Sequence, residues 1–129
     1  MRIIKFRGKP IQGDKLYENF VYGNLAKYAS GVYNILVPIQ WGFENYKIDP
    51  ESIGQFTGLY DCEGKEIFEG DILDFNGLTV EVRFVRGVFA LLVNGNLDDE
   101  LCGDCRTDLF AKVIGNVYEN PDILKGGNK

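Results

Sequence analysis

The feature that most constrains this chain is a block at residues 53–72, in which glycines separate short runs of β-prone residues. Its glycines are Gly54, Gly58, Gly64 and Gly70. Glycine readily adopts the positive φ that tight turns require, so the backbone is expected to reverse direction at least twice within the block. Such spacing is typical of a small β-barrel or a tightly wound antiparallel sheet.

The pattern of short strands continues beyond this block. β-branched, aromatic and alternating residues predict five successive strands at residues 53–59, 65–68, 72–75, 79–84 and 88–93. Asn76-Gly77 and Asn94-Gly95 are strong signals for hairpin turns, because a type I′ turn needs positive φ at both central positions. Five strands joined by short turns form a meander that can curl into a small SH3-like or related β-barrel.

The remaining elements fit the same fold class. Further strands are predicted at residues 19–25, 32–37 and 111–118, with very short helical turns near Asp49-Pro50 and Asn120-Pro121. We therefore expect a mainly β protein, with β-rich α+β as the alternative. The 129 residues suit one compact domain, 1–129, with an N-terminal β region at about 1–47 and a barrel-like core at about 48–125.

Neither a long apolar run nor an apolar leader is present in the sequence, so we expect a protein of the cytoplasm without membrane contact. The three cysteines are then reduced thiols. Cys102 and Cys105 have the spacing of metal ligands, but a structural zinc site needs four ligands and the sequence has no histidine. The sequence predicts no metal site and no cofactor.

Positive charge is concentrated at the start of the chain. The cations there are Arg2, Lys5, Arg7 and Lys9, and in a strand the last three share one face. This face could contact nucleic acid or another partner, or pair with the acidic segment Asp98-Asp99-Glu100. A net charge of −5 opposes non-specific binding to nucleic acid, so we favour self-pairing or solvation.

Three carboxylates, Glu66, Glu69 and Asp71, lie within six residues of one another. Converging carboxylates can bind a divalent cation, which would suit a metal-dependent hydrolase or nuclease. Turn formation explains the same residues, because an aspartate after a glycine can accept backbone N–H groups. We favour the structural role and predict no catalytic residues.

Large aromatic residues offer another route to function. Trp41 and Phe43 follow Pro38 in a stretch that the sequence predicts to be irregular, where bulky apolar groups are difficult to bury within one barrel. They are candidates for a subunit interface.

Four segments in order, at residues 3–9, 20–25, 48–72 and 113–121, resemble the YopX family of phage and prophage proteins. The residues that carry the central signature are Gly54, Gln55, Thr57, Gly58, Asp61, Gly64, Glu69, Gly70 and Asp71. The resemblance implies a protein of a phage or prophage in a bacterial host cell, with no established reaction. We expect a non-enzymatic binding or scaffolding module that forms a homo-oligomer and binds a phage or host macromolecule.

Overall fold

The computed structural model describes residues 3–12, 15–16, 19–95, 100–101 and 106–126. It contains two compact units, Met1–Phe56 and Thr57–Lys129, and the boundary falls within strand β7 (Gly54–Tyr60). The sequence places the internal border near residue 47 instead. That the whole chain acts as one domain stays a prediction.

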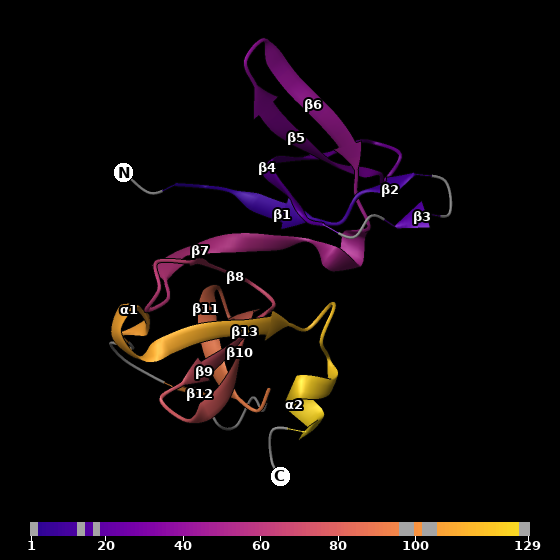
Figure 1. Ribbon diagram of the computed structural model, residues 1–129. Coiled ribbons are helices and arrows are strands. Elements are labelled where there is room, and N and C mark those ends of the chain that lie inside the picture. The colour runs from indigo at the N-terminus through magenta and orange to yellow at the C-terminus, as the bar shows by residue number, and fades with distance from the viewer. Residues whose placement is uncertain (1–2, 13–14, 17–18, 96–99, 102–105, 127–129) are drawn as a thin grey trace. The chain divides into compact units, whose positions relative to one another are not determined.

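The first unit is built on an antiparallel sheet with the strand order β6-β5-β4-β1-β7 (Figure 1). Its strands are β1 (Phe6–Gly8), β4 (Val21–Lys27), β5 (Tyr33–Ile39), β6 (Gly42–Lys47) and the first residues of β7. A small hairpin of β2 (Ile11–Gln12) and β3 (Lys15–Leu16) precedes β4. The short 3-10 helix η1 (Pro50–Ser52) begins after Asp49, whose side chain accepts the N–H of Glu51, as the sequence predicts.

The core of the first unit forms on one face of this sheet, around Ile35 and Ile48, which are fully buried. Gly8 lies directly against both side chains, and a Cβ there would collide with Ile48. The opposite face of β4, β5 and β6 is open, since Tyr22, Phe43 and Asn45 on it are exposed. One face of this part of the sheet therefore holds the core while the other meets solvent.

The second unit contains the later part of β7, which runs beside β8 (Glu66–Phe68), and a five-stranded antiparallel sheet. The sheet order is β12-β11-β10-β9-β13, with β9 (Asp71–Phe75), β10 (Leu78–Val85), β11 (Val88–Val93), β12 (Glu100–Leu101) and β13 (Ala111–Asn116). Two short helices, α1 (Thr107–Phe110) and α2 (Asp122–Gly126), flank β13 (Figure 1). The apolar core brings together Ile67, Leu73, Val80, Val82, Leu91 and Ala111.

The five predicted central strands and the mainly β class are confirmed. Asn76-Gly77 joins β9 to β10 with φ of 51° and 95°, which is the left-handed geometry of a type I′ turn. The described strands do not close into a barrel. The reason is that β8 pairs with β7 rather than with β9, while the late strand β13 returns to pair with β9 and ends the meander.

Candidate functional site

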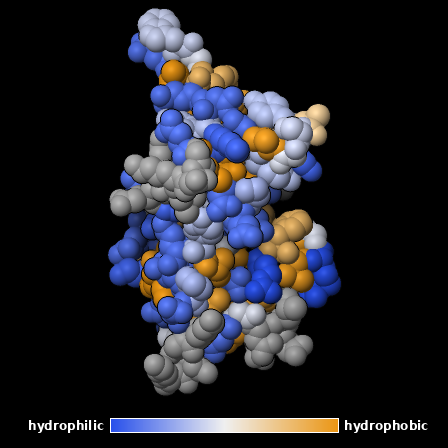
Figure 2. Space-filling model, turned by 90° about the vertical axis from the view of Figure 1, so that its right-hand side faces the viewer, coloured by the Kyte–Doolittle hydropathy of each residue, from blue (hydrophilic) through white to orange (hydrophobic). Residues whose placement is uncertain are grey.

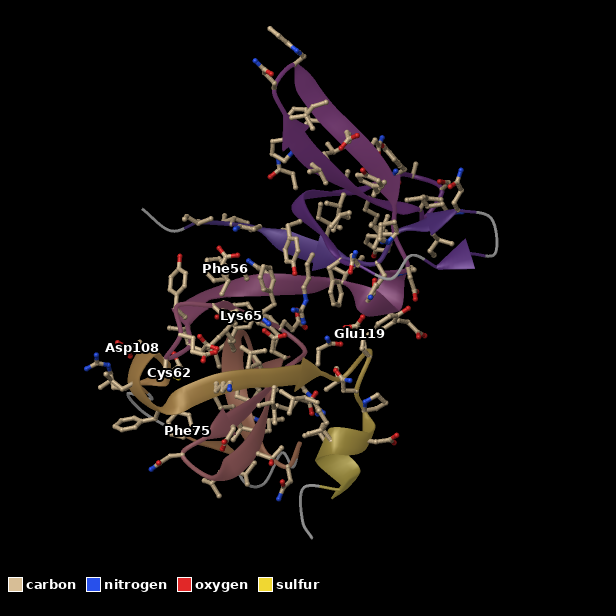
Figure 3. All side chains as sticks on the ribbon, viewed as in Figure 1. Phe56, Cys62, Lys65, Phe75, Asp108 and Glu119 are labelled. Carbon is tan, nitrogen blue, oxygen red and sulfur yellow. The ribbon has the colours of Figure 1, made fainter. Side chains whose placement is uncertain are left out.

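Asp61 organises the loop between β7 and β8. One carboxylate oxygen accepts the N–H groups of Glu63 and Lys65 at 2.9 and 2.8 Å, and the other accepts the N–H of Val113 at 3.0 Å. The N–H of Cys62 also donates to Ala111, so the loop is fastened to β13. Figure 3 shows Cys62 and Lys65 in this loop, beside β13. One buried side chain therefore holds together segments 52 residues apart.

The electrostatics of Asp61 follow from this geometry. Burial opposes ionisation, but the N–H groups of Val113, Lys65 and Glu63, together with the positive charge of Lys65, outweigh it and lower the pKa of Asp61 below its usual value. The carboxylate is thus held in the ionised form. Backbone N–H groups occupy both oxygens of this carboxylate, so its role is structural.

Asp71 has a similar role at the turn between β8 and β9. It is buried, and its carboxylate accepts the N–H of Phe68 at 2.8 Å. Within the same turn, Gly70 has a φ of 94°, donates to the carbonyl of Val82 and accepts from the N–H of Val117. This turn joins β10 to the segment that follows β13.

The three carboxylates Glu66, Glu69 and Asp71 do not assemble a cation site. No group of three or more His, Cys, Asp or Glu side chains in the described part of the chain is arranged to hold a metal ion. The geometry of the described residues therefore gives no support to the metal-site alternative, which stays a prediction. The physical reason is that Asp71 turns inward to bond the backbone, so closeness in sequence does not make the carboxylate oxygens converge.

The sequence indicates that the cations of the N-terminal strand lie on an exposed face, but in the structure two of them are buried. Arg7 and Lys9 are only 7% and 3% exposed, and both cations lie over the ring of Phe20, at 4.5 and 4.8 Å from its centroid. Lys5 lies 5.6 Å from the centroid of Phe56. β1 is an interior strand that pairs with β4 on one edge and with β7 on the other. Alternation in the sequence predicts which residues share a face, but it does not predict which strands are neighbours. Arg2 lies outside the described residues.

The β5–β6 hairpin places the predicted interface residues at a protruding position. Trp41 is in the two-residue turn and is 89% exposed, while Phe43 and Ile39 on either side are 57% and 47% exposed. In Figure 2 the upper end, which is the tip of this hairpin, carries hydrophobic and near-neutral residues among hydrophilic ones. The sequence pattern misses β6 itself, because Gly42 resembles a loop residue and β6 is exposed along most of its length.

The cysteines add no site to this description. Cys62 is exposed and forms no disulfide. Cys102 and Cys105 lie outside the described residues. None of the described helices is both long enough and apolar enough to span a membrane.

Comparison with known proteins identifies the family. The model of the family described as "YopX protein" matches residues 5–125, which is nearly the whole chain. The chain belongs to the YopX family. None of the curated proteins matches it.

A solved structure supports the fold of this YopX-family chain. The crystal structure of protein EF1440 from Enterococcus faecalis is 25% identical, with a TM-score of 0.57. The match covers 96% of this chain and 99% of that one. The structure explains several residues of the central signature. Gly64 and Gly70 have positive φ in the connections on either side of β8, Gly58 has positive φ within β7, and Asp61 and Asp71 accept backbone N–H groups.

Proposed function

We propose that this YopX-family protein is a non-enzymatic binding or scaffolding module that self-associates, serving a phage or prophage in the cytoplasm of its bacterial host. The observation that carries the proposal is the exposed apolar tip of the β5–β6 hairpin, formed by Ile39, Trp41 and Phe43. Tryptophan and phenylalanine are enriched at protein interfaces, where their large rings supply much of the binding energy.

The energetic argument rests on Trp41. A tryptophan side chain has roughly 200 Å² to bury, and apolar burial contributes about 25 cal/mol per Å², so covering this mostly exposed ring would favour association by about 4 kcal/mol before the costs of association. A second copy of the chain presents the same tip. The isologous contact of a two-fold dimer would cover both rings at once.

The test is the mass of the protein in solution, measured by light scattering over a concentration series. We expect the wild type to gain mass with concentration, and Trp41→Ala to stay a monomer over the same range. Leu78→Ser is the matched control, because Leu78 is an exposed apolar residue in a different hairpin, between β9 and β10. A wild type that stays monomeric at every concentration would refute the proposal.

A further inference from the structure

The exposed face of β4, β5 and β6 has a composition unlike that of an ordinary solvent-facing sheet. Strand register aligns Asn24, Leu36 and Asn45 in one row, and Ala26, Asn34 and Lys47 in the next. Its aromatic residues are Tyr22, Tyr28 and Phe43, all exposed. We call this surface, made by Tyr22, Asn24, Tyr28, Asn34, Phe43, Asn45 and Lys47, the tyrosine–asparagine face.

The side chains on this face are connected to one another. Asn34 donates to Asn45, and Asn45 donates to the hydroxyl of Tyr28 at 3.4 Å. Asparagine is disfavoured in strands, yet three of them occupy β4, β5 and β6 here. Tyrosine and asparagine are also the residues that recognition surfaces use for apolar contact and adaptable hydrogen bonding.

Charge distinguishes this face from the rest of the chain. The protein carries 19 acidic residues and a net charge of −5, but none of the residues of the tyrosine–asparagine face is acidic. In the described part of the first unit, the acidic residues are Glu44, which points to the opposite side of β6, and Asp49 and Glu51 at η1. Two copies of an acidic chain repel each other at low salt, and a contact surface without carboxylates keeps this repulsion small.

We propose that the tyrosine–asparagine face packs against the same face of a second copy of this chain, about a two-fold axis. This inference rests on the self-association proposed above, and it extends the contact from the hairpin tip to the sheet face. The two sheets would lie about 10 Å apart, with rings and amides interleaved between them. Phe43 belongs to both the tip and the face.

The size of the face sets the expected strength. Three strands spaced about 4.8 Å apart and roughly seven residues long, at about 3.3 Å per residue, make a sheet patch of roughly 300 Å² before side-chain relief. Standard stable interfaces bury about 800 Å² per partner, so the face together with the tip should give a weak dimer with a roughly micromolar dissociation constant.

The decisive variant is Asn45→Asp, which places a carboxylate in the middle of the face with almost no change of shape. The fold should persist, because an aspartate can still accept from Asn34, and the Tyr28 hydroxyl, to which Asn45 donates, can instead donate to the carboxylate. The control is Asn76→Asp, which adds the same charge at an exposed turn where Asn76 has a φ of 51°, a conformation that aspartate tolerates. Sedimentation velocity over a concentration series gives the dissociation constant of each.

We expect Asn45→Asp to weaken self-association at least about tenfold at low salt, with partial recovery at high salt, and Asn76→Asp to leave it close to wild type. Tyr22→Ser, which removes an exposed ring without adding charge, should also weaken it. If Asn45→Asp and Tyr22→Ser both associate like the wild type while Trp41→Ala does not, the face is refuted and the hairpin tip stands. A monomeric wild type refutes both, and equal weakening by the two Asn→Asp variants refutes a local role for the face.

Discussion

Removing the buried Asp61 carboxylate should destabilise the second unit substantially. Asp61→Ala leaves the N–H groups of Glu63, Lys65 and Val113 without their acceptor. A lost hydrogen bond of this kind costs about 1 kcal/mol, so the three together predict a loss of about 3 kcal/mol. Single domains are stable by only about 5–15 kcal/mol, which makes this a substantial fraction.

Thermal and urea unfolding provide the assay. For a chain of this size, about 3 kcal/mol corresponds to a fall in Tm of roughly 10 °C. Asp108→Ala is the control, since Asp108 is an exposed partner of Arg106 and its removal should leave Tm unchanged. An Asp61→Ala variant whose unfolding free energy lies within about 0.5 kcal/mol of wild type would refute the reasoning that Asp61 fastens the loop to β13.

Three further predictions concern stability. Because the folded pKa of Asp61 is lowered, its contribution to stability is fully present above the unfolded pKa of about 3.9 and is lost as pH falls through the folded value. The difference in unfolding free energy between wild type and Asp61→Asn, measured by urea unfolding, should therefore be constant near neutrality and shrink below about pH 4. Gly23→Ala should cost about 1–3 kcal/mol in thermal unfolding, because its Cβ would collide with the backbone carbonyl of Leu36 on β5; a neutral result would contradict that close approach. Asp71→Ala should cost at least about 1 kcal/mol through the orphaned N–H of Phe68, and Mg²⁺, Mn²⁺ or Zn²⁺ should not raise the Tm of the wild type.

Local turn chemistry made much of the fold predictable from the sequence. The tight turns at Asn76-Gly77 and Arg86-Gly87 require positive φ at both central residues, and these residues adopt it. Because the turns are fixed, the strands between them can begin and end at only a few positions. Asp49 before Pro50 similarly marks η1. These signals depend on neighbouring residues alone.

The same local signals do not predict which strands pair with one another. Alternation shows that Lys5, Arg7 and Lys9 share a face, but it shows neither that β1 lies between β4 and β7 nor that the ring of Phe20 lies against the buried Arg7 and Lys9. The pairing of β13 with β9, which leaves the sheet open, likewise joins segments far apart in sequence.

The candidate sites were predictable to different degrees. The exposure of Trp41 was expected from its stretch of sequence, although the regular hairpin that presents it was not. The tyrosine–asparagine face could not be found in the sequence, because it requires the register that aligns Asn24 with Leu36 and Asn45. The turn role of Asp61 was expected, but its bond to Val113 spans 52 residues and only the fold reveals it.

Self-association of the wild-type chain is the central claim, and sedimentation equilibrium tests it most directly. The account predicts a weight-average mass that rises from the 14.5 kDa of one chain toward twice that value as concentration passes through the micromolar range. A mass that stays at 14.5 kDa from low micromolar to millimolar concentration would contradict it.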